Sequence, residues 1–216
     1  MSNIISILNP KGGCGKTTIS SNLASSLLKS GHQTLLIDTD PQGTLRDWKS
    51  MDVNDNQPEI IAIDRPNLQK NLNLISSSFD YLIIDGAAKL QDMVTFAVKN
   101  SDFVIIPIQP SAADIWACEP LIELIKARQE ISNGKPYASF IVSRQIKNSN
   151  LAKDIEDTLA HFNFPVLNSR TTQRVIYSEA LSSGKSIFDL DNNNEASSEI
   201  LSLTKELKRI IDEKKL

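Results

Sequence analysis

The sequence has few cysteines, no long apolar run and no surplus of basic residues, and each absence excludes a class of protein. Its two cysteines, Cys14 and Cys118, lack the spacing of metal ligands, which argues against a zinc site and favours reduced thiols of a cytosolic protein. No stretch approaches the roughly 18 apolar residues of a membrane span, and the N-terminus lacks a signal-type segment. We therefore predict a cytoplasmic protein.

The charge balance excludes a protein whose whole surface attracts nucleic acid. The chain has 23 Lys and Arg against 26 Asp and Glu, which gives a net charge of −3. Any contact with DNA would therefore need a local basic patch. At 216 residues the chain can bury one sizeable core, and we predict a single domain over residues 1–216.

A glycine-rich stretch, PKGGCGKTT at residues 10–18, stands between an apolar run and a helical pattern. Glycines let successive backbone N–H groups point into one anion-sized hollow at a helix N-terminus, so the pattern predicts a phosphate-binding loop. Lys16 adds a positive charge for the β- and γ-phosphates of a nucleoside triphosphate, and Thr17 offers a hydroxyl to its Mg²⁺. The predicted nucleotide contacts are Gly12, Gly13, Cys14, Gly15, Lys16, Thr17 and Thr18.

Three aspartates follow apolar runs that predict strands. Asp38 and Asp40 come after residues 34–37, and Asp85 ends the run YLIID, which is a Walker B pattern. In an open α/β sheet, ligands bind at the carboxyl ends of the strands, so these carboxylates are expected beside the phosphate loop. We predict that Thr17 and Asp85 hold Mg²⁺.

Apolar runs alternate with helical patterns along the chain. Runs at 4–8, 34–37, 81–85, 103–108 and 138–142 predict five buried strands. Helical patterns include residues 68–75, residues 150–161 and a final amphipathic stretch from 195 to about 212, which Asn194 can cap. This order predicts an α/β fold with a doubly wound, mostly parallel sheet and helices on both faces.

The phosphate loop departs from the general P-loop pattern, because Pro10 holds the place of its first glycine and Lys11 follows. This departure resembles the deviant Walker A motif, KGGxGK[TS], of the ParA/MinD family of ATPases. The string DTDPQG at residues 38–43 is similar to the Walker A′ motif of the same family. The resemblance implies that Lys11 reaches a partner subunit's nucleotide, and that Asp38 and Asp40 organise Mg²⁺ and the attacking water. Lys11, Asp38 and Asp40 are therefore the expected catalytic residues.

Residues 169–189 resemble the stretch near the C-terminus of partition ATPases, and the chain begins at its first strand without a helix-turn-helix domain. It is thus similar to the short form of plasmid or chromosome partition ATPase. The resemblance implies a homodimer formed with ATP, DNA binding without sequence preference, nucleoid association when ATP is bound, and a centromere-binding partner of the ParB/ParG type. Candidate DNA-binding residues are Arg170, Arg174, Lys185, Lys205, Lys208 and Arg209.

Three other functions share the phosphate loop. A MinD-like membrane-cycling ATPase would need a C-terminal anchor, and the apolar face of the final amphipathic stretch lacks Trp and Phe, so no membrane contact is expected. An iron–sulfur electron-transfer protein would need cysteines after Asp85, where the sequence reads Gly-Ala-Ala. A small-molecule ligase or kinase stays an alternative, because a P-loop does not specify a second substrate.

Overall fold

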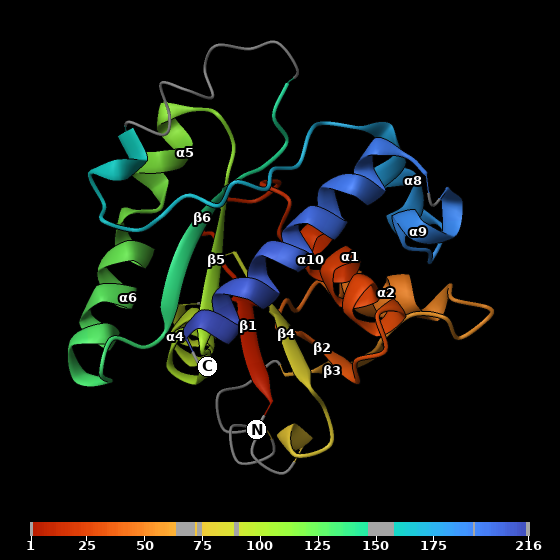
Figure 1. Cartoon of the computed structure of the whole chain (residues 1–216), viewed down its shortest axis with the longest axis horizontal. Coiled ribbons are helices and arrows are strands. Elements are labelled where there is room, and N and C mark those ends of the chain that lie inside the picture. Colours follow the sequence, from red (N-terminus) through yellow and green to blue (C-terminus); the bar gives the residue numbers. More distant parts are fainter. Residues whose placement is uncertain are drawn as a thin grey trace.

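The apolar runs form the strands of one parallel sheet. The computed structural model describes residues 2–63, 72, 75–88, 91–146, 158–191 and 193–214. The strand order is β3-β2-β4-β1-β5-β6, and every pair of neighbours is parallel (Figure 1). The strands are β1 (Asn3–Ile7), β2 (Thr34–Asp38), β3 (Glu59–Ala62), β4 (Tyr81–Asp85), β5 (Phe103–Ile108) and β6 (Tyr137–Val142).

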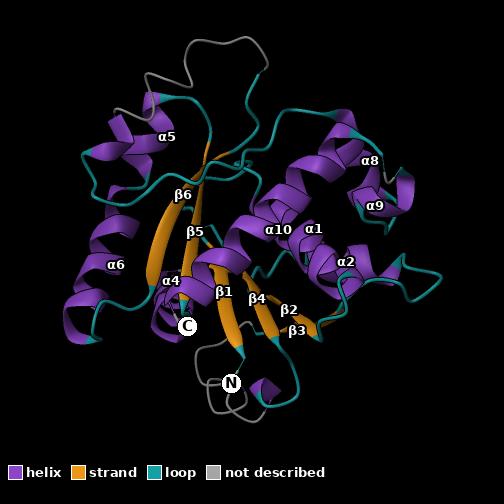
Figure 2. Cartoon of the chain, in the orientation of Figure 1, coloured by secondary structure: helices purple, strands orange, loops and turns teal. Residues whose placement is uncertain are grey.

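Helices cover both faces of this sheet (Figure 2). They are α1 (Lys16–Lys29), α2 (Thr44–Ser50), α4 (Gln91–Asn100), α5 (Ala112–Ala117), α6 (Glu119–Ile131), α8 (Val175–Ser182), α9 (Ile187–Leu190) and α10 (Glu195–Lys214). Alternate residues of a strand pack into two separate hydrophobic cores, one on each face of the sheet. Leu82 and Ile84 of β4 share a core with α4 and α6, whereas Ile83 shares the other with α1 and α10. Each buried aliphatic side chain contributes about 1.5–3 kcal/mol, so both faces hold their helices. The predicted doubly wound fold is confirmed.

The sheet has six strands, and the prediction of five was wrong in number. The missed strand, β3, pairs with β2 at the edge of the sheet. It is four residues long, and its end residues Glu59 and Ala62 are exposed. Residues 60–63 form a short apolar run, Ile-Ile-Ala-Ile, so the signal that identified the other five strands was also present here and was overlooked. The helices predicted at 68–75 and 150–161 lie largely outside the described residues.

The final helix, α10, begins where the sequence places its cap. The Asn194 side chain accepts a hydrogen bond from the Ser197 N–H at 2.7 Å, and the helix runs two residues past the predicted end. Its apolar face is buried in the core shared with α1, through Leu203, Leu207 and Ile211. Packing on the domain thus accounts for the amphipathic pattern. Among the residues that the structure describes, no helix combines the length and apolarity needed to cross a bilayer.

Candidate active site

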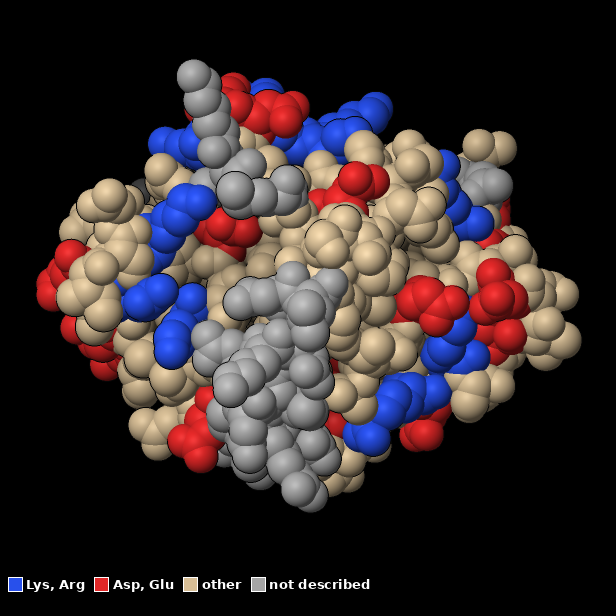
Figure 3. All heavy atoms as spheres, turned by 90° about the horizontal axis from the view of Figure 1, so that it is seen from below, with Lys and Arg blue, Asp and Glu red and all other residues tan. Residues whose placement is uncertain are grey.

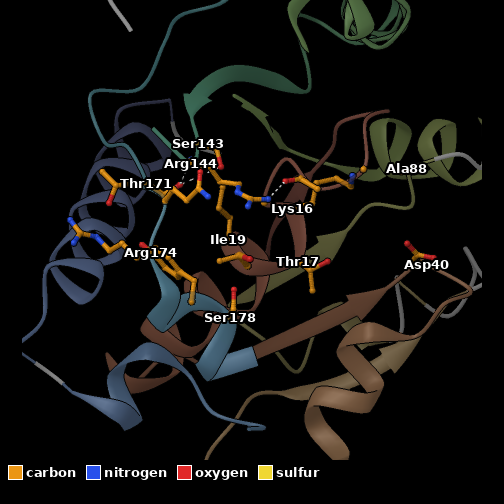
Figure 4. Close-up of a pocket in the computed structure, with 17 residues that line it drawn as sticks. Lys16, Thr17, Ile19, Asp40, Ala88, Ser143, Arg144, Thr171, Arg174 and Ser178 are labelled. Atoms are coloured by element: carbon orange, nitrogen blue, oxygen red, sulfur yellow. Dashed lines mark hydrogen bonds between the residues drawn. The ribbon is translucent and has the colours of Figure 1, made fainter. Parts of the chain in front are cut away.

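The candidate site lies at the carboxyl edge of the central strands. Asp38 of β2 and Asp85 of β4 end neighbouring strands in the same register, and Ile7 of β1 is aligned with Asp85 from the other side. Beside them is an open pocket of about 270 Å³ (Figure 4). The phosphate loop and first turn of α1 form one side of it, and the segments around Arg144 and Thr172 form the other.

The pocket collects most of the predicted contacts. Cys14, Asp38 and Asp85 are buried and do not line it, and burial raises the pKa of the Cys14 thiol. Lys11 lies outside the pocket wall, and Asp40 stands at the end opposite Arg174 (Figure 4). The predicted residues that line the pocket are Gly12, Gly13, Gly15, Lys16, Thr17, Thr18 and Asp40.

The backbone of the loop takes a conformation that only glycine accepts readily. Gly15 has φ +94°, and a Cβ at this position would lie 2.7 Å from the Ser143 hydroxyl. Gly15 also occupies the N-cap position of α1, where no side chain accepts a hydrogen bond from the first turn. The N–H groups of that turn therefore remain available for an anion, which the helix dipole also favours.

Neighbouring loops fix the carbonyl groups of the phosphate loop. The Gly13 carbonyl accepts hydrogen bonds from Arg144 Nη1 at 2.6 Å and Gln109 Nε2 at 2.8 Å, and the Cys14 carbonyl accepts one from Ser143 Oγ at 2.8 Å. These donors follow β5 and β6 and were not predicted. The available signal was their position directly after an apolar strand, the same signal that identified Asp38 and Asp85.

The two lysines of the loop have different surroundings. Lys16 is only 8% exposed, and its Nζ donates to the Lys11 carbonyl at 2.9 Å, so the side chain folds over the loop. Lys11 is 44% exposed, and its ammonium forms an ion pair with the buried carboxylate of Asp114 in α5. The second oxygen of Asp114 is buried without a hydrogen-bond partner among the described residues. Lys11 is thus held by a carboxylate of its own chain.

Asp85 is the centre of a small polar cluster. Its carboxylate accepts hydrogen bonds from Thr17 Oγ1 at 2.8 Å and Ser20 Oγ at 2.9 Å. Burial raises the pKa of Asp85 to about 7 in spite of these bonds, because removal from water disfavours the charged form. A nearby cation would stabilise the carboxylate. The structure therefore brings Thr17 and Asp85 together in the way that the predicted Mg²⁺ site requires.

The third predicted Mg²⁺ ligand, Asp38, already has partners. It accepts the Asp40 N–H at 3.0 Å and pairs with Arg46 Nε at 3.3 Å, while burial raises its pKa. In the part of the chain that the structure describes, no group of three or more His, Cys, Asp or Glu could hold a metal ion. Mg²⁺ usually takes one or two protein ligands together with phosphate oxygens and water. The residues present fit an ion that arrives with a phosphate ligand.

The candidate DNA-binding cations are distributed unevenly. Lys205 and Arg209 are exposed on α10, although Arg209 pairs with Glu213 at 3.2 Å, and Lys208 Nζ is 2.9 Å from His32 Nε2. Arg174 lines the pocket and pairs with Glu195 at 2.5 Å and Glu199 at 3.0 Å. On the face of the molecule seen in Figure 3, small groups of basic side chains alternate with small groups of acidic ones. That face offers no continuous basic surface among the described residues.

Comparisons with known proteins agree with this site. The family model described as CobQ/CobB/MinD/ParA nucleotide binding domain matches residues 5–188. The "Maintenance of carboxysome distribution protein A" of Halothiobacillus neapolitanus is 32% identical over 190 residues, covering 86% of this chain and 87% of that protein. The "Chromosome partitioning protein ParA" of Myxococcus xanthus is 26% identical over 249 residues, covering 94% and 87%.

A solved structure supports the fold independently. The septum site-determining protein MinD of Pyrococcus horikoshii, solved with Mg-ADP, aligns with a TM-score of 0.75 at 18% identity and covers 97% of each chain. A likeness at this identity extends to the architecture alone. The family model spans most of the chain, and the carboxysome-distribution relative exceeds 30% identity over a similar share. The chain therefore belongs to the CobQ/CobB/MinD/ParA family of nucleotide-binding domains.

Proposed function

We propose that the protein is a ParA-type positioning ATPase that binds ATP with Mg²⁺, dimerises on ATP and binds DNA without sequence preference. The observation that carries the proposal is the arrangement of Lys16, Thr17 and Asp40 around one pocket, with Asp85 bonded to Thr17 and a second lysine, Lys11, just outside. A centromere-binding partner protein of the ParB/ParG type would trigger hydrolysis and release. The ATP-bound dimer would be associated with the nucleoid.

The chemistry of the pocket suits phosphoryl transfer. Phosphoryl transfer needs the reacting groups in position and the charge on the γ-phosphate neutralised. Lys16 and the N–H groups after Gly15 would bind the phosphates, Thr17 and Asp85 would hold Mg²⁺, and Asp40 would orient water. The metal would withdraw charge from the phosphate oxygens.

The ion pair between Lys11 and Asp114 supports the proposal that a single subunit has an incomplete site. While Lys11 stays on Asp114, its charge serves a buried carboxylate of its own chain and lies outside the pocket. For Lys11 to reach a partner's phosphates, it must leave Asp114. ATP on the partner would supply the competing negative charge, which makes dimerisation part of the active site and couples it to the nucleotide.

Asp40→Ala is expected to bind ATP normally and to hydrolyse it roughly a hundredfold or more slowly, because the lost carboxylate orients water and does not hold the nucleotide. The measurements are ATP affinity by calorimetry and phosphate release at saturating ATP. Asp47→Ala removes an exposed carboxylate from the nearby α2 and should change neither quantity. A normal rate in Asp40→Ala would transfer the role to Asp38.

DNA binding tests the proposed function directly. We expect binding with ATP, weaker binding with ADP or without nucleotide, and an affinity that falls steeply with salt, with log K losing about 0.9 per neutralised phosphate for each tenfold rise in salt. The proposed contacts are Arg170, Arg174, Lys185, Lys205, Lys208 and Arg209. Dimerisation would double a weak patch and let both copies act on one duplex.

The sharpest variant combines Lys205→Ala and Arg209→Ala, two of the exposed cations of α10. It should flatten the salt slope by up to about 1.8 per subunit while ATP-driven dimerisation stays intact. A matched control, Lys126→Ala with Arg128→Ala, removes two cations from α6 in the other helical layer. If the wild-type dimer does not bind DNA at low salt, the proposed role in DNA partition is wrong. A membrane-cycling ATPase then becomes the better proposal, and pelleting with liposomes in the presence of ATP tests it.

A second candidate function keeps the ATPase and changes the cargo. The relative with 32% identity is named for carboxysome distribution, whereas those named for chromosome partitioning are less similar. Both candidate functions predict the same nucleotide binding and the same ATP-dependent dimer, and they differ in the partner protein. A metabolite screen against the purified protein would separate both from a ligase or kinase on the same fold.

A further inference from the structure

The wall of the pocket that faces the phosphate loop comes from a segment with little regular structure. Between β6 and α8, residues 168–174 form no helix or strand. The Thr171 N–H donates to the carbonyl of Val142 at the end of β6, and the backbone of Gln145 bonds to Thr171 and Gln173. Three side chains of this wall, those of Thr172, Arg174 and Tyr177, line the pocket, and Figure 4 places Arg174 at the end opposite Asp40.

One carboxylate on α10 receives all three of these residues. Glu199 Oε1 accepts hydrogen bonds from the Thr172 hydroxyl at 2.6 Å and from Arg174 Nε and Nη2 at 3.1 and 3.0 Å. Glu199 Oε2 accepts the Thr172 N–H at 3.0 Å and the Tyr177 hydroxyl at 2.8 Å. Five donors from the wall of the pocket thus converge on a single side chain from another element.

The surroundings of Glu199 make these bonds strong. Its side chain is 15% exposed, and Arg174, which is 22% exposed, compensates its charge. Charge-assisted hydrogen bonds to a partly buried carboxylate are stronger than neutral ones, and a donor left without its acceptor there is costly. Burial, followed by the negative charge of Glu199, raises the pKa of Tyr177, so its hydroxyl remains a donor.

We propose that Glu199 is a positioning residue for nucleotide recognition, which orders the pocket wall that the nucleoside part of a bound nucleotide contacts. The proposal rests on the assignment of a nucleotide to this pocket. The phosphate loop and Lys16 lie on the opposite side and have no bond to Glu199. Loss of the carboxylate should therefore weaken nucleoside contacts and leave the grip on the phosphates unchanged. This role of Glu199 would also make α10 a structural support of the nucleotide site.

The same helix offers a matched control two turns later. Glu206 accepts the N–H groups of Asn168 and Ser169, both at 2.8 Å, and so anchors the same segment. Neither Asn168 nor Ser169 lines the pocket. A change at Glu206 tests the general effect of loosening this segment from α10, whereas a change at Glu199 tests the pocket wall itself.

The experiment compares ATP with inorganic tripolyphosphate, which has the phosphates without the nucleoside, as competitors of a fluorescent nucleotide. In Glu199→Gln, ATP affinity should fall about tenfold, or about 1.4 kcal/mol, while tripolyphosphate affinity stays within about twofold. KM for ATP should rise more than kcat falls. Glu206→Gln should leave both affinities within about twofold of wild type. Melting temperatures of both variants report any loss of stability.

Two results would overturn the proposal: unchanged ATP affinity in Glu199→Gln, or equal losses for ATP and tripolyphosphate. Should Glu199→Gln fail to fold, Tyr177→Phe combined with Thr172→Val removes two donors from the wall and decides the question with the same pair of ligands. Wild-type protein that binds neither ligand would instead refute the nucleotide assignment and with it the proposed function.

Discussion

Lys16→Ala is expected to weaken ATP binding about a hundredfold or more, which abolishes binding at micromolar protein concentration. The Lys16 side chain is buried, and its Nζ donates a hydrogen bond to the loop carbonyl of Lys11, beside the first turn of α1. Without Lys16, the phosphate loop would contribute no cation to the pocket. The two arginines that line it, Arg144 and Arg174, are bonded to the Gly13 carbonyl and to Glu199. Calorimetric titration with ATP provides the measurement.

The control for this variant is Lys29→Ala at the other end of α1. Lys29 bonds to Asp189 at 2.8 Å, far from the pocket, so its loss removes the same charge and affects stability alone. ATP affinity should equal that of wild type. Unchanged affinity in Lys16→Ala would mean that residues 10–18 do not bind the triphosphate.

Lys11→Ala is expected to bind ATP and to remain monomeric, because Lys11 lies outside its own pocket and its charge would serve the phosphates of the partner. Sedimentation velocity with saturating ATP distinguishes monomer from dimer. Hydrolysis should fall to the level of the isolated subunit.

Asp114→Asn is the counterpart of this variant, since it removes the carboxylate that holds Lys11. Removing one member of an ion pair lowers the stability of the fold by several kcal/mol when the remaining charge stays buried. The Lys11 side chain is 44% exposed, so its ammonium can turn into water instead. We expect Asp114→Asn to dimerise with ATP at least as readily as wild type. A normal ATP-dependent dimer in Lys11→Ala would assign this lysine to its own subunit.

The fold was predictable because its signals are local. Buried parallel strands appear in the sequence as continuous apolar runs, and the glycines before Lys16 predict a turn that leads into a helix. The edge strand β3 carries the same signal in a run of only four residues, 60–63, beside a polar loop, and it was overlooked. The prediction of a single domain over residues 1–216 stays a prediction.

The candidate site was only partly predictable, because several of its contacts join residues far apart in the chain. Asp114 meets Lys11 across 103 positions, and Arg144 meets Gly13 across 131. Sequence spacing does not reveal such pairs. Arg174 illustrates the same point. Its charge suggested a DNA contact, whereas its ion pair with Glu199 depends on how α10 packs and has no signal in the sequence.

The central claim, that the active site is assembled from two subunits, is tested most directly by mixing Lys11→Ala with Asp40→Ala. Both variants should bind ATP and hydrolyse little alone. In a mixed dimer, the Lys11→Ala subunit has its own Asp40 and would receive Lys11 from its partner, so one site is complete. We predict that the mixture releases phosphate well above the sum of its parts. A mixture no faster than that sum would contradict the account, because a lysine that acts within its own subunit leaves every site of the mixed dimer incomplete.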